Sequence, residues 1–311
     1  MRLPTPMTLV PKVFLSVAMV GICGCASTFD VDGALAVAPY SIAENGLIVV
    51  EARVNDQGPF NFALDTGASI SFLFDELTNE LAIEPVPETS IIVHGAVASG
   101  QFPLLNISRL QVEGETWLEP RIVSLPDRTL ARTDIDGVLG INFMKRYALG
   151  FSARDQVLRL YPPELVRDRA YRGWASVPLR PANIRDSGET LYFFEININE
   201  RNVRALFDLG ATTNMINWPA ADQIGIVRMN MDPDALIAGA IDSAQVVAEF
   251  TARGVRAGGI RWRNQQFLIA DLSIFSVLDH EDSPLAIVGT GLFNRRDFVI
   301  DFVRNRLLVE Y

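Results

Sequence analysis

The sequence predicts an all-β protein built from two similar lobes in tandem. Short runs rich in Val, Ile, Leu and Phe alternate with turn residues along most of the 311-residue chain, a pattern typical of strands joined by tight turns. Several sequence blocks recur in the same order in the second half, which indicates an internal duplication. Segments with helical character are short, as at 74–83 and 218–226. We therefore expect two β-rich lobes related by a pseudo-two-fold axis.

Two aspartates mark the start of the duplication, each at the end of an apolar run. Asp65 in FNFALDTGASISFL corresponds to Asp208 in VRALFDLGATTNMI, 143 residues later. Gly140 in DGVLG follows Asp65 by 75 residues, and Gly289 in AIVGTG follows Asp208 by 81. Between them, HGAVASGQ aligns with AGAIDSAQ, and one tryptophan-containing segment aligns with another. Near-constant spacing over four blocks predicts that both halves share one fold.

The repeat also places the domain boundaries. The stretch YPPELVRDRAYRGW carries two prolines and several charges, and we expect a linker within it at 164–173. The two lobes then occupy 38–163 and 174–311. Residues 25–37 would form a tether, and residues 1–24 a leader that is removed. Because both lobes lie in one chain, we expect a monomer.

The amino terminus carries features of an export signal. Two cations precede a ten-residue apolar run, which is too short for a membrane span of about 20 residues. The ICGC motif that follows resembles the lipobox of bacterial lipoproteins, which implies cleavage after Gly24 and acylation of Cys25. Several acyl chains there would give stable membrane anchoring, whereas an ordinary signal peptide cut nearby is the alternative. We expect a periplasm-facing chain, and Ala26 favours the outer membrane.

Cysteine, charge and histidine counts exclude several classes of function. Cys23 and Cys25 are the only cysteines, so the processed chain must be stable without internal disulfides. A formal net charge of −10 without basic clusters argues against nucleic-acid binding. His94 and His280, the only histidines, occupy non-equivalent places in the repeat. We therefore expect no metal site, no Ser-His-Asp site and no cofactor.

One aspartate per lobe suggests a shared acid–base site. Two carboxyl groups within hydrogen-bonding distance cannot both ionise easily, so one keeps a proton. Such a pair can deprotonate a water molecule with one carboxylate and protonate a carbonyl oxygen with the other. A hairpin or Asx-turn aspartate is the simpler interpretation of either residue alone, and the duplicated context favours the pair.

The motifs ALDTGAS with DGVLG, and LFDLGAT with AIVGTG, resemble those of the retropepsin-like and pepsin-like aspartic proteases. The resemblance covers essentially the whole mature chain. It implies two β-barrel lobes with an active-site cleft between them, and Asp65 and Asp208 as the catalytic pair that hydrolyses peptide bonds without a cofactor. The positions that would support the two catalytic loops are Thr66, Gly67, Leu209 and Gly210.

The resemblance also implies flap segments that close over a bound peptide. Residues His94, Gly95, Ala96 and Val97 in the first lobe, and Gly239, Ala240 and Ile241 in the second, occupy that place in the repeat. Two comparable segments favour the symmetric retropepsin arrangement over the single flap of pepsins. The glycines among them could instead be ordinary hairpin glycines.

Leu209 departs from the family pattern, which has threonine or serine at that position. The hydroxyl that would brace the two loops from this side is absent, and a lost hydrogen bond typically costs about 1 kcal/mol. The leading interpretation is an aspartic endopeptidase that acts on exported or periplasmic polypeptides. The alternative is a peptide-binding lipoprotein with weak or no catalysis. A purely structural surface lipoprotein would leave the two Asp-x-Gly motifs unexplained.

Overall fold

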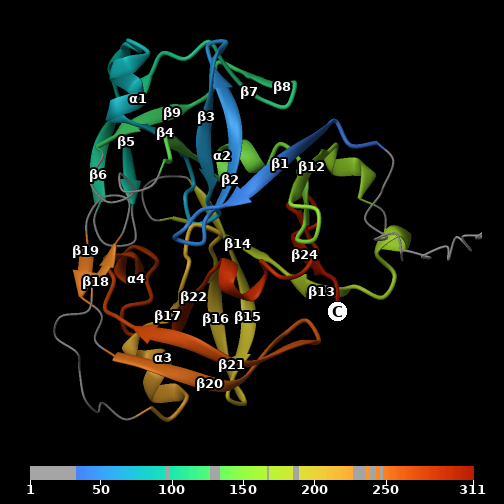
Figure 1. Cartoon of the computed structure of the whole chain (residues 1–311). Helices are drawn as coiled ribbons and strands as arrows, with labels where there is room; N and C mark the ends of the chain where they lie inside the picture. Colours follow the sequence, from blue (N-terminus) through green and yellow to red (C-terminus); the bar gives the residue numbers. More distant parts are fainter. Residues whose placement is uncertain are drawn as a thin grey trace, which may run out of the picture.

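The computed structural model describes residues 33–94, 99–126, 134–166, 168–184, 189–226, 236–238, 243–245 and 248–311. The leader and Cys25 lie outside these residues. Within them most of the regular structure is β-strand, with only short helices, and the strands form an upper and a lower lobe in Figure 1. Of the helices in this described part, none is long and apolar enough to cross a membrane.

The first lobe is built around β3, the strand that leads into the Asp65 loop. β3 pairs in parallel with β10, β10 is antiparallel to β4, and β4 pairs in parallel with β9. The elements are β2 (Ile48–Val54), β3 (Gln57–Leu64), β4 (Ser71–Phe74), α1 (Asp75–Glu80), β5 (Pro85–His94), β6 (Ser99–Leu105), β7 (Arg109–Val112), β8 (Glu115–Leu118), β9 (Ile122–Leu125), β10 (Gly137–Leu139) and α2 (Ile141–Met144).

The second lobe repeats this pairing pattern. β16 pairs in parallel with β22, β22 is antiparallel to β17, and β17 pairs in parallel with β21. The elements are β14 (Arg180–Asn183), β15 (Thr190–Ile198), β16 (Arg201–Phe207), β17 (Asn214–Ile216), α3 (Trp218–Gln223), β18 (Leu236–Ala238), β19 (Ser243–Gln245), β20 (Ala248–Ala257), β21 (Ile260–Ile269), α4 (Ser273–Val277), β22 (Leu285–Val288) and η3 (Thr290–Leu292). The predicted duplication and the all-β fold are confirmed.

A six-stranded section of a 15-stranded sheet joins the lobes (right side of Figure 1), and the sequence did not predict it. Its order is β13-β24-β23-β11-β12-β1, with the bounds β1 (Ala36–Ile42), β11 (Ala148–Ser152), β12 (Val157–Tyr161), β13 (Ala175–Pro178), β23 (Phe298–Asp301) and β24 (Arg306–Val309). β11 pairs with β23, so strands from the two repeats meet directly. Phe151 stacks on Phe298 across this junction, with ring centroids 4.4 Å apart. The apolar core therefore runs from one lobe into the other.

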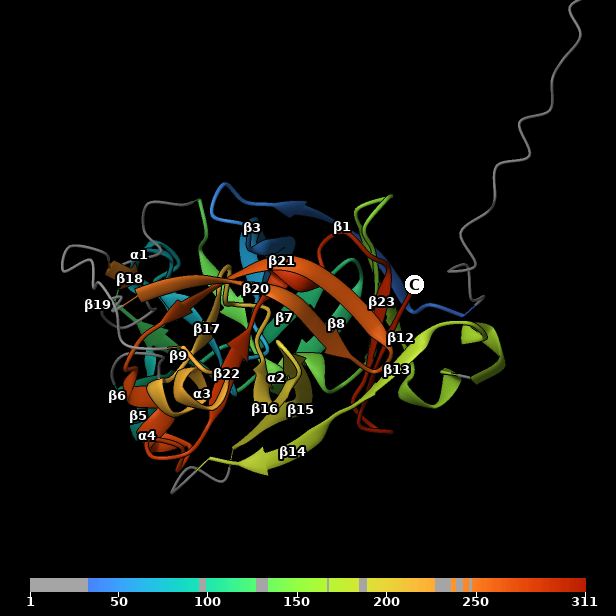
Figure 2. The ribbon, with the colours of Figure 1, turned by 90° about the horizontal axis from the view of Figure 1, so that it is seen from below.

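The segment between the lobes packs against this sheet. It forms two short turns, η1 (Pro163–Leu165) and η2 (Asp168–Tyr171). Val166 and Tyr171 are buried in one cluster with Val299 of β23. Figure 2, seen from below, shows the segment beside β12 and β13. The connection is therefore fixed by apolar contacts as well as by its covalent ends.

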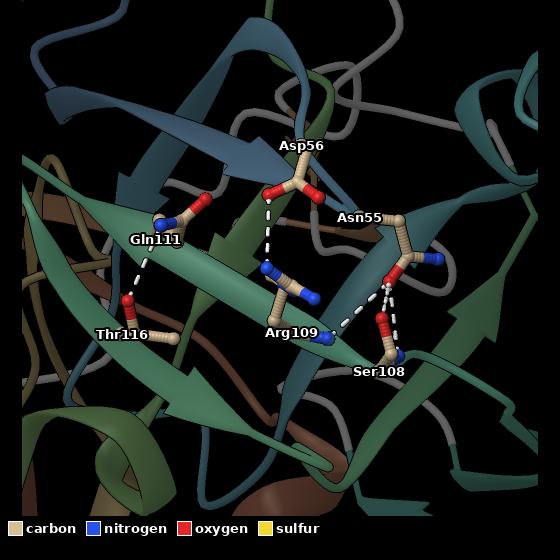
Figure 3. A network of polar contacts seen from close by, with 6 residues as sticks. All are labelled: Asn55, Asp56, Ser108, Arg109, Gln111 and Thr116. Atoms are coloured by element: carbon tan, nitrogen blue, oxygen red, sulfur yellow. Dashed lines mark hydrogen bonds and ion pairs between the residues drawn. The ribbon is translucent and has the colours of Figure 1, made fainter.

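The hairpins β2–β3 and β15–β16 occupy equivalent places in the two lobes, and an asparagine in each turn bonds to a neighbouring strand. Asn55 and Asn199 have positive φ, at 48° and 46°, a conformation that asparagine tolerates better than most residues. Asn55 Oδ1 accepts hydrogen bonds from the N–H groups of Ser108 (2.9 Å) and Arg109 (3.3 Å) and from the Ser108 hydroxyl (Figure 3). Asn199 Oδ1 accepts from the N–H of Arg253 at 2.9 Å. Equivalent turns thus anchor equivalent strands in both lobes.

Asn55→Gly is expected to lower the free energy of unfolding by about 1–3 kcal/mol, because three donors lose their acceptor while glycine still tolerates the positive φ. Arg109→Gln is the control, since it breaks only the exposed 3.4 Å ion pair with Asp56 (Figure 3) and should change stability by less than about 1 kcal/mol. Urea unfolding of the two variants measures both values. Equal losses would contradict the assigned role of Asn55.

Candidate active site

The side chains of Asp65 and Asp208 meet where the two lobes join. Asp65 follows β3 and Asp208 follows β16, the equivalent strand. Their carboxyl groups are hydrogen-bonded to each other, and both residues keep part of their surface accessible. In each loop the Oδ1 atom accepts from the backbone N–H groups two and three residues further on, at 2.7 and 3.1 Å for Asp65 and 2.8 and 3.1 Å for Asp208. Each loop therefore presents one carboxyl group, and the two carboxyl groups accept equivalent backbone hydrogen bonds.

Gly67 and Gly210 allow this close approach. A Cβ atom at Gly67 would lie 2.6 Å from the carboxyl group of Asp208, and one at Gly210 would overlap the carboxyl group of Asp65 even more closely. Real Cβ atoms do not pack at such distances. Each glycine is thus required because the opposing carboxyl occupies the space of a side chain.

The hydroxyl of Thr66 braces one loop against the other. It donates to the carbonyl oxygen of Phe207 at 2.8 Å and accepts from the N–H of Leu209 at 2.9 Å. Thr66 is fully buried, so water does not compete for these bonds. Leu209 is also fully buried and packs in the main apolar core. Its side chain has no hydroxyl group that could bond to the backbone of the Asp65 loop, so only Thr66 braces the two loops.

The two glycine motifs run beneath the Asp-bearing loops. The N–H of Gly140 donates to Ser71 Oγ at 3.0 Å, and the N–H of Gly289 donates to Asn214 Oδ1 at 3.2 Å. A Cβ at either glycine would collide with the backbone of the loop above it. Sequence reasoning missed Ser71 and Asn214, although each lies six residues after its aspartate. Their equal spacing was a usable signal, but their different residue types concealed it.

Burial raises the pKa of both Asp65 and Asp208, because a charged carboxylate loses hydration between the lobes. The pKa of Asp208 is raised further by the negative charge and the hydrogen bond of Asp65. Hydrogen bonds from Asp208 and from backbone N–H groups counteract the rise at Asp65. The pair titrates as one unit, and over a range of pH it holds a single proton between an acid and a base.

The flap candidates lie only in part within the described residues. His94 ends β5, which forms a long hairpin with β6, and its Nδ1 atom lies 2.7 Å from the hydroxyl oxygen of Ser99. Gly95, Ala96 and Val97, and likewise Gly239, Ala240 and Ile241, lie outside the described residues. The hairpin β18–β19 flanks the second group. Both hairpins lie on the same side of the molecule in Figures 1 and 2.

The remaining histidine is not arranged to activate a nucleophile. His280 Nε2 lies 3.3 Å from the guanidinium of Arg204, and Nδ1 lies 2.6 Å from Ser283 Oγ. A guanidinium only donates, so Nε2 accepts and Nδ1 carries the hydrogen that it gives to the serine. His280 therefore cannot take a proton from Ser283. Within the described ranges, no group of three or more His, Cys, Asp or Glu residues could hold a metal ion.

The fold and site together define a bilobal β protein with one aspartate from each lobe in a shared pair. A family model described as aspartyl protease matches residues 50–143 and 194–290, and each match contains one aspartate loop and its glycine motif. The chain belongs to this aspartyl protease family. The family and the two-lobe fold predicted from the sequence are thus confirmed.

Other comparisons are more distant. Among solved structures, the chain is similar to a retropepsin-like aspartic protease from Rickettsia conorii, with 18% identity and a TM-score of 0.32. The similarity covers 44% of this chain and 95% of that chain. Likeness at this level carries no argument about chemistry. Comparison with curated proteins finds no match.

Asp208→Asn is expected to stabilise the protein at neutral pH. The pKa of Asp208 is raised in the folded state, so the wild type loses stability as pH rises from the unfolded value of about 3.9 through the folded one. Asparagine does not ionise and avoids this loss. In thermal unfolding from pH 3.5 to 7.5, the melting temperature of the variant should rise relative to that of the wild type as the pH rises.

The matched control is Asp282→Asn, because Asp282 is exposed on the surface. It should show no comparable trend across the same pH range. A wild type that is more stable than Asp208→Asn at pH 7, by a margin that grows with pH, would contradict the raised pKa.

Proposed function

We propose that the chain is an aspartic endopeptidase whose catalytic residues are Asp65 and Asp208. The supporting observation is the hydrogen-bonded carboxyl pair, raised in pKa and partly accessible, at the junction of the lobes. With one shared proton, the ionised carboxylate removes a proton from a water molecule while the protonated carboxyl donates to the peptide carbonyl oxygen. Water attacks the carbonyl carbon directly, so the reaction needs no cofactor and no covalent intermediate.

The loop residues have positioning roles in this proposal. Thr66 holds the backbone around Asp208, and Gly67 and Gly210 let the carboxyl groups come together. Leu209 fills the core where a second hydroxyl would stand. Catalysis depends steeply on such geometry, because a misplaced group loses the advantage of pre-oriented reactants.

The proposed substrates are exported or periplasmic polypeptides in extended conformation. The support is the leader with its ICGC motif, from which we propose a periplasm-facing monomer anchored through lipid at Cys25, in the outer membrane. The hairpins β5–β6 and β18–β19 would close over the substrate.

The second candidate function is a peptide-binding lipoprotein with weak or no catalysis. Leu209 favours it, because the brace from the second lobe is missing. Against it stands the Thr66 hydroxyl, which by itself makes hydrogen bonds to both backbone groups that flank Asp208. The two candidates differ in whether bound peptides are cleaved.

Incubation of the purified mature chain with a diverse peptide library, from mildly acidic to neutral pH, tests the proposal. The wild type should cleave peptides, and Asp65→Asn should not, because the pair then lacks its second ionisable carboxyl. Mass spectrometry identifies the products. Peptides retained by both proteins without any cleavage would support the binding protein instead.

Leu209→Thr is expected to preserve or raise kcat, because a hydroxyl there restores the second half of the brace. Thr66→Val is the counterpart, since it removes both existing bonds while keeping the shape of the side chain, and it should lower kcat by tenfold or more, for about 1.4 kcal/mol. Steady-state kinetics on one library-derived peptide compares them. A severe loss in Leu209→Thr, with its fold intact by circular dichroism, would contradict the role given to the brace.

A further inference from the structure

A polar cavity lies beside the Asp208 loop in the second lobe. Its volume is about 370 Å³, and its walls include Thr212 and Thr213 in the loop, Thr251 in β20 and Gln266 in β21. Apart from one glycine, every residue that lines it carries an amide or a hydroxyl, and none is charged. β20 and β21 run side by side in the lower lobe of Figure 1. The composition is unusual for a pocket, because ligand sites are mostly apolar.

The Asp208 loop connects the cavity to the proposed catalytic pair. Thr212 follows Asp208 by four residues, which places their Cα atoms at most about 14 Å apart even in a fully extended chain. The first lobe lies against Thr212, since a Cβ at Gly46 would be 3.6 Å from its side chain. An extended peptide has the same rise per residue. The cavity is therefore within reach of a side chain about four residues or fewer from a scissile bond.

The polar groups of the cavity are available to a ligand. Within the described part of the chain, no hydrogen bond engages the hydroxyl groups of Thr212, Thr213 and Thr251 or the amide of Gln266. Asn214 differs, because its amide is bonded to Gly289 and to the backbone of β21. An apolar side chain would strip water from the free groups without replacing it, and a charged one would find no counter-charge. A neutral polar side chain fits best.

The first lobe shows that the fold does not require this polarity. Ile70 and Thr213 occupy equivalent positions, five residues after Asp65 and Asp208. Ile70 is 3% exposed and packs in an apolar cluster of the first lobe, whereas Thr213 is exposed. The same backbone position thus accepts an apolar residue in one lobe. The polar cavity is a property of the second lobe.

We propose that this cavity is a specificity subsite that selects substrates carrying Ser, Thr, Asn or Gln within about four residues of the cleaved bond. The proposal rests on the proposed function for its link to cleavage, but recognition of the side chain does not require catalysis. Two variants remove polar groups from the cavity: Thr213→Ile, which copies the first lobe, and Gln266→Leu. Gln57→Leu is the matched control, because Gln57 is an exposed glutamine at the far end of β3 from Asp65.

The experiment uses the full chain in detergent and a library of peptide pairs that differ only by Thr against Val, or Gln against Met. Cleavage is followed in the wild type, and retention of uncleaved peptides is followed in Asp65→Asn. At one fixed position the polar member should be preferred by about three- to tenfold, as expected for one hydrogen bond. Thr213→Ile and Gln266→Leu, tested in both backgrounds, should bring this ratio towards one, while Gln57→Leu keeps it.

The outcomes separate this proposal from the proposed function. Cleavage without any polar preference overturns the subsite and leaves the endopeptidase standing. Retention with a preference that Thr213→Ile abolishes, but no cleavage by the wild type, supports the subsite and overturns the endopeptidase. A preference that survives both cavity variants places recognition elsewhere and overturns the subsite. Absence of both cleavage and retention overturns the two together.

Discussion

The hydroxyl of Thr66 holds together the two loops on which the rest of the site depends. By donating to Phe207 and accepting from Leu209 it ties the backbone on both sides of Asp208 to the loop of Asp65. Because both partners are backbone atoms, the bonds fix the position of the whole loop. The opposing carboxyl groups can then lie against Gly67 and Gly210 and share a hydrogen bond. The raised pKa of the pair follows from this enforced proximity and burial.

The scaffold around this centre is symmetric, whereas the centre is not. Matching strands, glycine motifs and hairpin asparagines occur in both lobes, and β11 pairs with β23 across the junction. A threonine at position 209 could add up to two hydrogen bonds, each worth about 1 kcal/mol, whereas burying leucine contributes about 1.5–3 kcal/mol. The two choices are similar in stability, so the folded lobes tolerate leucine. Leucine in place of threonine instead changes how the two loops are aligned, and the free energy of unfolding does not report this alignment.

The sequence was sufficient for features that repeat locally. Asp65 and Asp208 were identified because a strand, an aspartate and a glycine recur together, and the structure brings them into contact. The shared sheet was not predictable in this way. Strands of this sheet recur in both halves, as in ALGFSARDQVLRLY and FVIDFVRNRLLVEY, but the repeat does not say which of them pair across the junction. The partners of Thr66 were equally hidden, since Phe207 and Leu209 contribute backbone atoms that any residue would supply. Ser71 and Asn214 were missed because different side chains perform one task.

The structure also changes which of the two aspartate loops lacks a hydroxyl brace in the proposed dyad. The sequence alone predicts that the missing hydroxyl at Leu209 leaves Asp208 poorly held. In the structure the backbone on both sides of Asp208 is hydrogen-bonded to the Thr66 hydroxyl, as acceptor at Phe207 and as donor at Leu209, so this aspartate is the braced one. The backbone groups that would receive the reciprocal brace flank Asp65 instead. That loop relies on the neighbouring strand β10, where the carbonyl oxygen of Leu139 accepts from the N–H of Asp65 at 3.1 Å, as Val288 does for Asp208 at 3.0 Å, and on the burial of Thr66 itself. Any looseness that leucine introduces should therefore be sought at Asp65, in the lobe that has the complete Asp-Thr-Gly motif.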